Sequence, residues 1–218
     1  MILKVKQVKT DTEDVFSLIF EKPKDFQFYA GQYLDYELPI KDPLGNTRAF
    51  TISASPTEDF LMLSTKYGST PFKKALAQLK AGDEIKTSHP AGTFTLDESS
   101  SAVFIAGGVG ITPFRSMIKY AVDNHIKTPI TLLYSNTDDN FLFKKELKEW
   151  VKLLPKLTII YHNSTQNGHL TTLYPIPYTL YPIYYLAGSH SFVNDLEKIL
   201  IDSGVDETNI RYDRFDGY

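Results

Sequence analysis

The chain has 218 residues, of which 42% are hydrophobic and 22% are charged, as in an ordinary soluble protein with a substantial core. Its formal net charge of −3 gives no electrostatic reason to expect nucleic acid or an anionic membrane as a partner. It contains no cysteine, which excludes disulfides, thiolate nucleophiles, thiolate zinc sites and an iron–sulfur cluster held by its own side chains.

No segment has the character of a membrane span or a signal peptide. The longest uncharged apolar stretch, residues 102–111, is about half as long as a span requires. The first residues, MILKVKQVKTD, lack the apolar core of a signal peptide. We therefore expect a cytoplasmic protein without membrane insertion, and we favour a monomer while leaving the oligomeric state open. The histidines show no metal-ligand spacing, so no metal site is expected.

The first half of the chain has the two-residue period of β-strands. Six short segments are rich in β-branched and aromatic residues, and turn-forming residues separate them; they are 3–8, 15–21, 32–38, 48–54, 60–66 and 83–88. Strands at this spacing predict an antiparallel β-barrel or sandwich. One segment, residues 69–83, has a helical period instead. Ser69 or Thr70 can cap this helix, and Pro71 suits its first position.

The period changes near residues 97–101. Buried strands at 103–106, 130–135, 157–161 and 183–187 then alternate with helical segments, and the chain closes with NIRYDRFDGY. Strands that alternate with helices predict a Rossmann-like α/β domain with a five-stranded parallel sheet and right-handed crossovers. We place the domain boundary between residues 98 and 99.

The stretch VFIAGGVGITPFRS, residues 103–116, is a candidate binding turn. Its glycines follow the first strand of the α/β domain, and ligands collect at the carboxyl ends of parallel strands; they are Gly107, Gly108 and Gly110. Glycines accept positive φ angles and close approach of a ligand, and Thr112 and Pro113 suit the start of a helix. The pattern predicts either a phosphate cradle or a tight strand-to-helix turn that binds nothing.

This stretch resembles the G-G-x-G-I-T-P segment of the ferredoxin–NADP⁺ reductase superfamily, which are two-domain flavin reductases. In that family the segment lies under the nicotinamide dinucleotide. The resemblance implies NAD(P) contacts from Gly107, Gly108, Gly110, Ile111, Thr112 and Pro113. Three further matches follow the family's order across the chain, so residues 1–98 are expected to be an FAD-binding β-barrel domain and residues 99–218 an NAD(P)-binding domain.

The first further match is Arg48-Ala49-Phe50-Thr51, which is similar to the family's R-x-[YF]-[ST] flavin motif. Residues two apart on a strand share a face, so Arg48 and Phe50 are expected to point the same way. The resemblance implies that Arg48 binds the FAD pyrophosphate through its fork of donors and that Phe50 offers a flat surface to the flavin. Thr51 is implied as a catalytic contact near flavin N5, and Ala49 as a backbone neighbour of the cofactor.

The second match is residues 66–72, KYGSTPF, at the start of the predicted barrel helix. The family binds pyrophosphate at this point, which implies FAD contacts from Lys66, Gly68, Ser69 and Thr70. The nearby segment HPAGTF, residues 89–94, resembles the family's G-P-x-G-x-F turn. Because His89 replaces the first glycine, we assign that turn to structure.

The third match is at the end of the chain. Ala187-Gly188-Ser189-His190 resembles the C/A-G-P-P segment that faces the nicotinamide, although no cysteine precedes Gly188 and Ser189-His190 replaces the proline pair. Residues 215–218, FDGY, resemble the family's F-x-G-Y terminus. Tyr218 is thus implied as a catalytic lid over the flavin, and Phe215 as a flavin contact.

The second parallel strand ends at Ser135-Asn136, where the adenosine ribose of NAD(P) is expected. The segment that follows, Thr137-Asp138-Asp139, contains two acidic residues, which favour the free 2′-hydroxyl of NADH over the 2′-phosphate of NADPH. Lys144 and Lys145 begin the next helix and could reach back to a phosphate, which keeps NADPH open.

The resemblance implies an FAD-dependent NAD(P)H oxidoreductase. Hydride would pass from NAD(P)H to FAD, and electrons would then pass to an external acceptor such as a ferredoxin, a flavodoxin, a cytochrome or a partner oxygenase. Two alternatives remain. The protein could be a flavin reductase that uses free flavin as a substrate, or a non-catalytic subunit that only binds flavin.

Overall fold

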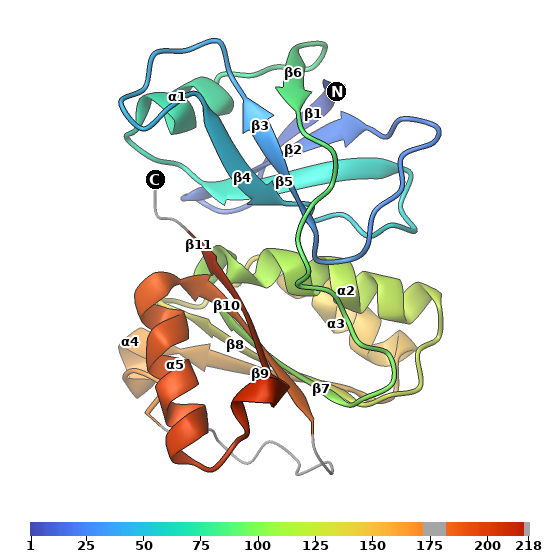
Figure 1. The fold of residues 1–218 in the computed structure, drawn as a ribbon, viewed down its shortest axis with the longest axis vertical. Coiled ribbons are helices and arrows are strands. Elements are labelled where there is room, and N and C mark those ends of the chain that lie inside the picture. Colours follow the sequence, from blue (N-terminus) through green and yellow to red (C-terminus); the bar gives the residue numbers. More distant parts are fainter. Residues whose placement is uncertain (172–181, 216–218) are drawn as a thin grey trace.

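The computed structural model describes residues 1–171 and 182–215 and contains two packed halves, each built on its own sheet (Figure 1). The N-terminal half is a six-stranded antiparallel sheet in the order β4-β3-β6-β1-β2-β5, as expected. Its strands are β1 (Ile2–Thr10), β2 (Val15–Glu21), β3 (Tyr33–Glu37), β4 (Thr47–Thr51), β5 (Phe60–Lys66) and β6 (Glu84–Thr87).

This sheet curls toward a barrel because its edge strands approach each other. Just beyond β4, the Ser53 backbone N–H donates to the Met62 carbonyl oxygen of β5 at 2.7 Å. One helix, α1 (Pro71–Ala77), follows β5. The Thr70 side chain caps it by accepting from the Lys73 backbone N–H at 3.3 Å, and Pro71 is its first residue. The predicted cap and first position are therefore confirmed.

The C-terminal half is a five-stranded parallel sheet in the order β11-β10-β7-β8-β9, which confirms the expected Rossmann-like arrangement. Its strands are β7 (Ala102–Gly107), β8 (Ile130–Asn136), β9 (Leu157–Asn163), β10 (Ile183–Ser189) and β11 (Ile210–Phe215). The helices are α2 (Ile111–Asp123), α3 (Lys144–Leu153), α4 (Ser164–Asn167) and α5 (His190–Asp202), with 3₁₀ turns η1 (Gly108–Gly110) and η2 (Glu207–Asn209).

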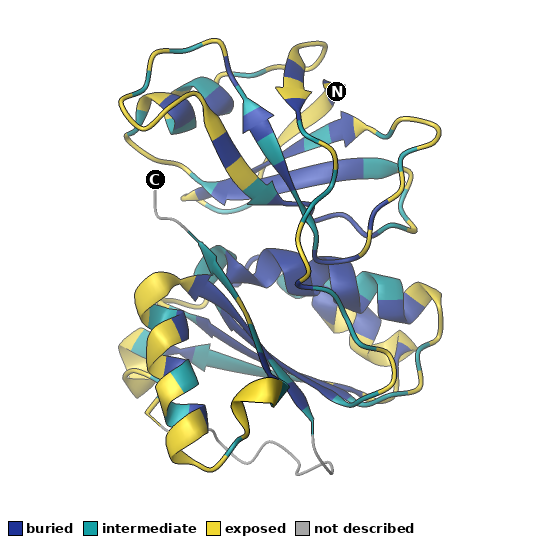
Figure 2. Cartoon of the chain, in the orientation of Figure 1, coloured by how far each residue is buried: buried dark blue, intermediate teal, exposed yellow. Residues whose placement is uncertain are grey.

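Helices cover both faces of the parallel sheet. In Figure 1, α2 and α3 lie between this sheet and the N-terminal half, and α5 lies on the opposite face. Alternate residues of β7 pack into two different cores. Phe104 lies in the core that includes α2 and the N-terminal half, and Val103 lies in a separate core under α5. Because both faces are covered, β7 is almost entirely buried (Figure 2).

The predicted boundary at residues 98/99 lies in the connection between β6 and β7, and it stays a prediction. The Tyr- and Pro-rich sequence of residues 162–181 predicts a loop, but Ser164–Asn167 form the single turn α4, which Asn163 caps through its side chain. Residues 172–181 of that segment, and Tyr218, lie outside the described residues. Within residues 1–171 and 182–215, no helix is long and apolar enough to cross a membrane.

Candidate functional site

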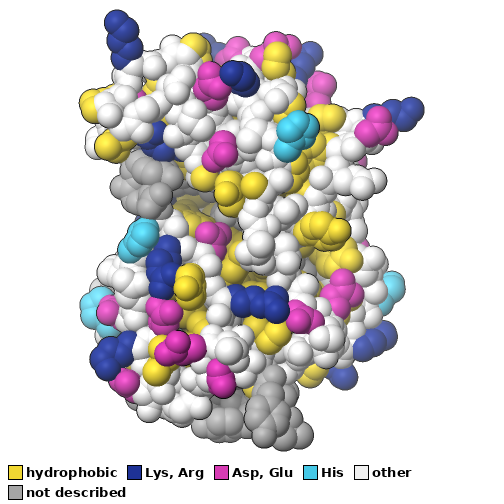
Figure 3. Space-filling model, viewed as in Figure 1, with side chains coloured by type: hydrophobic (Ala, Val, Ile, Leu, Met, Phe, Trp, Pro, Cys, Tyr) yellow, Lys and Arg dark blue, Asp and Glu magenta, His cyan; other side chains and the backbone are white. Residues whose placement is uncertain are grey.

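A cleft of about 900 Å³ opens between the two halves. Its walls come from β4, β5 and the start of α1 on one side, and from the carboxyl ends of β7, β8 and β10 on the other. The molecule narrows at this level in the space-filling view, where Lys and Arg are interspersed with Asp and Glu instead of forming one basic patch (Figure 3). Among the described residues there is no group of three or more potential metal ligands.

The structure brings most of the predicted site residues together in this cleft. Those that line it are Ala49, Phe50, Thr51, Lys66, Gly68, Ser69, Thr70, Gly107, Gly108, Thr112, Ser135, Asn136, Gly188, Ser189 and Phe215. Four predicted residues are absent from the described lining: Arg48, Gly110, Ile111 and Pro113. The predicted lid, Tyr218, lies outside the described residues.

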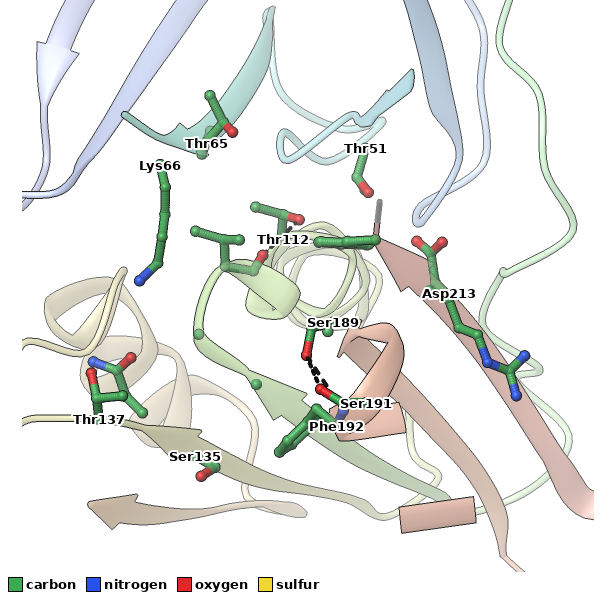
Figure 4. Close-up of a pocket in the computed structure, with 18 of the residues that line it drawn as sticks. Thr51, Thr65, Lys66, Thr112, Ser135, Thr137, Ser189, Ser191, Phe192 and Asp213 are labelled. Carbon is green, nitrogen blue, oxygen red and sulfur yellow. Dashed lines mark hydrogen bonds between the residues drawn. The ribbon is translucent and has the colours of Figure 1, made fainter. Parts of the chain in front are cut away.

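Strand β4 presents an aromatic ring and a hydroxyl to the cleft. The Phe50 ring stacks on Phe72 of α1, with centroids 6.1 Å apart, and meets Tyr36 edge-on at 5.8 Å. These neighbours fix its plane. Thr51 follows on the strand and points into the cleft from the N-terminal side (Figure 4). A flat apolar surface therefore lies directly beside a polar group.

Arg48 makes contacts that the sequence does not reveal. Its guanidinium donates to the carbonyl oxygens of Leu44, Gly45 and Thr47 at 2.8–2.9 Å, and it pairs with the buried Asp42 carboxylate at 3.3 Å. It thus shares a side of β4 with Phe50, and its Cζ atom lies 5.3 Å from the Phe72 ring centroid. In this arrangement Arg48 holds the 42–47 loop under α1, and its contact with pyrophosphate stays a prediction.

The glycine turn after β7 differs in detail from the expectation. Only Gly108 of the three has a positive φ, at 53°. Helix α2 begins at Ile111 with Gly110 as its cap residue, so Thr112 is not the N-cap; its hydroxyl donates to the Val109 carbonyl oxygen at 3.0 Å. Pro113 is the third helical residue instead of the first. The 3₁₀ turn η1 causes this shift, because it starts the helical winding earlier.

The end of β10 packs closely against this glycine turn. A Cβ on Gly107 or on Gly188 would lie 2.8 Å from the Phe192 ring, so glycine at both positions leaves room for that ring. Ser189 caps α5 by accepting from the Phe192 backbone N–H at 3.4 Å, and His190 is the first residue of that helix. Serine and histidine in place of a proline pair therefore build a capped helix start.

The sequence analysis missed four charged residues that line the cleft, Lys73, Asp195, Asp213 and Arg214, and two of them have shifted pKa values. Burial lowers the pKa of Lys73, in the first turn of α1, to about 8, and burial raises the pKa of Asp213, on β11, to about 6. Asp213 faces Thr51 across the cleft (Figure 4). Strand alternation could have found it, because Asp213 and Phe215 are two residues apart. Lys73 lies three residues after the cap Thr70. Helical spacing could have placed it beside the cap, because residues three apart on a helix are neighbours.

The end of β8 forms a polar loop at the far side of the cleft. The Asn136 amide donates to the Asp138 carboxylate at 2.9 Å, and Thr137 lines the cleft beside it. The Lys144 Nζ atom lies 5.0 Å from the Phe141 ring centroid and 5.3 Å from that of Tyr161, and it reaches the Asp139 carbonyl oxygen at 3.5 Å. Lys144 therefore does reach back toward this loop.

Comparison with known proteins agrees with the fold. The family described as "Oxidoreductase NAD-binding domain" matches residues 104–173. The flavohem-like FAD/NAD-binding domain of nitric oxide dioxygenase from Vibrio cholerae O1 biovar El Tor superposes with a TM-score of 0.79 at 21% identity, covering 98% of both chains. The chain therefore has the fold of that FAD/NAD-binding domain, and its α/β half is similar to oxidoreductase NAD-binding domains.

Among its relatives are proteins of two kinds. The flavohemoprotein of Bacillus subtilis is 27% identical over 215 residues, which cover 89% of this chain and 54% of that protein. The ferredoxin reductase component of a 3-ketosteroid-9-alpha-monooxygenase from Mycolicibacterium smegmatis is 28% identical over 179 residues, covering 76% of this chain and 50% of that protein. The chain thus spans about half the length of these relatives.

Proposed function

We propose that this chain binds FAD in the cleft, that hydride passes from a nicotinamide dinucleotide, with NADH favoured, to this FAD, and that electrons then pass to an acceptor outside these 218 residues. The observation that carries the proposal is the composition of the two walls. Phe50, Thr51 and the 66–70 segment lie on one wall, and the glycine turn and the end of β10 lie on the other. This division supports a flavin against the N-terminal wall and a nicotinamide against the C-terminal wall.

The residues of the cleft fit a flavin dinucleotide and a nicotinamide. About 900 Å³ is near the upper end of ordinary ligand pockets, which span about 300–1,000 Å³. Gly108 has a positive φ, and a Cβ there would meet no atom closer than 3.9 Å, so a ligand can approach the main chain. Phe50 offers an aromatic surface for a planar ring, and Thr51 a hydroxyl beside it.

The chain's own residues bind and orient the two groups. Phe72 and Tyr36 hold the plane of Phe50, and Thr51 offers a hydrogen bond at the edge of that plane. The backbone of the glycine turn and Ser189 at the end of β10 would hold the nicotinamide opposite them. When bound, FAD supplies the redox chemistry, because it exchanges electrons with the nicotinamide in pairs and with acceptors in pairs or singly.

The preference for NADH rests on the acidic loop after β8. Asp138 and Asp139 follow directly after Asn136 and Thr137, which line the cleft where the adenosine ribose is expected, and their carboxylates would repel the 2′-phosphate of NADPH. Lys144 opposes this preference, but its amine is engaged by two aromatic rings and a carbonyl oxygen. We expect NADH to reduce the protein-bound flavin at concentrations at least about tenfold lower than NADPH.

Anaerobic titration with NADH and with NADPH, monitored by flavin absorbance, tests both the reduction of bound flavin and the preference for NADH. Asp139→Asn should narrow the difference between the two nucleotides, and Lys144→Met should leave NADH reduction unchanged. A preference for NADPH that Lys144→Met abolishes would reverse the assignment. A colourless protein that takes up no FAD on reconstitution would end the proposal, and flavin lost on gel filtration would point to free flavin as a substrate.

The acceptor is proposed to be a separate redox group. The chain has no cysteine with which to hold an iron–sulfur cluster. One relative is the ferredoxin reductase component of a monooxygenase, which supports a protein acceptor such as an oxygenase partner. A screen of ferredoxin, flavodoxin, cytochrome and free flavin with the NADH-reduced protein identifies the class.

A further inference from the structure

Lys73 places a positive charge in the wall of the cleft, and no carboxylate of residues 1–171 or 182–215 pairs with it. Its Nζ atom donates to the Thr65 hydroxyl and to the Lys66 carbonyl oxygen at 3.3 Å, and lies 5.3 Å from the Phe50 ring centroid. These partners are all neutral. Within the part of the chain that the structure describes, no ion pair involves Lys73.

The other cations of the lining are already neutralised. Lys66 pairs with Asp14 at 2.7 Å, and Arg214 pairs with Glu197 at 2.5 Å. An ammonium group that is largely removed from water and has no counter-charge is costly, which is why burial lowers the pKa of Lys73 to about 8. A protein that keeps such a group at a binding cleft gains from it when an anion binds there.

The local backbone lets the Lys73 side chain take this path. A Cβ on Gly68 would lie 2.9 Å from Lys73 Cγ and 3.1 Å from its Cβ, so the stem passes through the space that glycine leaves open. Gly68 and Lys73 both line the cleft. The stem therefore reaches the cleft wall beside Phe50, and the amine has three donors of which two are used.

We propose that Lys73 is the counter-charge for the phosphate groups of FAD, so that this cleft selects phosphorylated flavins over riboflavin and takes up a proton with them. The inference rests on the proposed function, since it concerns how that site holds FAD. A lysine ammonium binds phosphate as a point charge. The anion would stabilise the charged form, and FAD binding would weaken as the pH rises above about 8, where the free protein loses this charge.

Other ionisable groups border the same region and define the controls. On the neighbouring elements of the N-terminal half, and across the cleft, these groups are Tyr33, Asp42, Arg48, Lys66, Tyr67, Lys74, His169, Asp195, Asp213 and Arg214. Lys74 is exposed on the same helix and does not line the cleft, so Lys74→Met is the matched control for Lys73→Met. Lys73→Arg tests whether a positive charge alone suffices.

Equilibrium binding of FAD, FMN and riboflavin to the full chain tests the proposal. We expect Lys73→Met to weaken FAD binding by about ten- to a hundredfold and to leave riboflavin binding within about twofold. Lys74→Met should bind all three as the wild type does, and Lys73→Arg should recover most of the FAD affinity. Calorimetry at pH 8 in buffers of different ionisation enthalpy should show uptake of about half a proton per FAD, which Lys73→Met abolishes.

Several outcomes would overturn the proposal while leaving the proposed function intact. One is an FAD affinity of Lys73→Met equal to that of the wild type. Another is an equal loss of affinity for riboflavin and for FAD, and a third is proton uptake that persists in the variant. Because the substitution removes a buried unpaired ammonium, Lys73→Met should be at least as stable as the wild type without flavin, and a variant that fails to fold also contradicts the argument. Failure of the wild type to bind any flavin would instead defeat the proposed function.

Discussion

At the scale of single residues, the charged groups of the cleft differ in what surrounds them. Lys66 and Arg214 have carboxylate partners, whereas Lys73 and Asp213 are buried without an ion pair among the described residues. Burial therefore favours the neutral form of each side chain, because it lowers the pKa of Lys73 and raises the pKa of Asp213. Such shifted groups are typical of binding sites, where an incoming ligand changes their surroundings.

Asp213 should make stability depend on pH in a defined direction. Its pKa is raised from 3.8 to about 6 by burial, so the folded protein holds this proton more tightly than the unfolded chain. Its contribution is fully present below about pH 4 and is lost as the pH rises through about 6. We expect urea denaturation to show that Asp213→Asn raises the free energy of unfolding at pH 7 and has little effect at pH 4.

The comparison between the two pH values supplies the control for this prediction. Asp195 also lines the cleft but lies on the exposed side of α5, so Asp195→Asn should change stability little at either pH. An Asp213→Asn variant that loses stability at pH 7 would mean that the carboxylate has a stabilising partner there, and the sign would be wrong.

At the scale of elements, the start of α2 depends on close backbone packing against β10. Gly110 has an ordinary helical φ of −60°, yet a Cβ there would lie 2.8 Å from the Gly188 nitrogen and closer still to the Ala187 carbonyl oxygen. Glycine is therefore required at position 110 because a Cβ would clash with the backbone of β10, and not because of its backbone angle. At Gly108 the reverse holds, because φ is positive and the surroundings are open.

Gly110→Ala should consequently destabilise the fold and shift the turn that lines the cleft. Because backbone atoms of a parallel sheet cannot retreat as a side chain does, we expect a loss of about 1–3 kcal/mol in the free energy of unfolding, measured by chemical denaturation. Gly108→Ala should lose about 1–2 kcal/mol, through the left-handed backbone angle alone. A Gly110→Ala protein as stable as the wild type would show that β10 and the turn can move apart.

At the scale of the whole molecule, Arg115 of α2 joins the two halves. Its guanidinium donates to the Ser53 carbonyl oxygen at 3.0 Å and to Glu58 at 2.8 Å in the N-terminal half, and to Glu146 of α3 at 2.9 Å. Phe143 and Trp150 cover it, with ring centroids at 5.2 and 5.4 Å. Since the cleft has a wall from each half, this buried cluster helps to set its width.

Removing Arg115 should loosen the molecule as well as destabilise it. Arg115→Ala leaves two carboxylates facing each other without their cation, so we expect a loss of about 3–5 kcal/mol in the free energy of unfolding. Proteolysis between the halves should accelerate in parallel. Lys152→Met, which breaks an exposed pair with Glu149, should change stability by less than about 1 kcal/mol. An equal effect of the two variants would show that the cluster contributes no more than a surface pair.

Sequence reasoning succeeded wherever the deciding interactions are local. The strand segments, the cap Thr70 and the first helical position of Pro71 follow from contacts within about four residues. Most of the motif residues line one cleft, and their roles there stay predictions. It misplaced the start of α2 because the η1 turn packs on β10. Gly110 of this turn contacts Ala187 of β10, which lies nearly 80 residues later in the chain.

What the sequence determined by itself, then, is the order and type of most elements, the two-sheet architecture and a resemblance of the α/β half to oxidoreductase NAD-binding domains. Only the tertiary structure decided which charges are paired: Arg48 with Asp42, Arg115 with Glu58 and Glu146, and Lys73 with no acid among the described residues. The physical reason is that periodicity and capping depend on near neighbours, whereas burial and charge pairing depend on groups that folding brings together from distant parts of the chain.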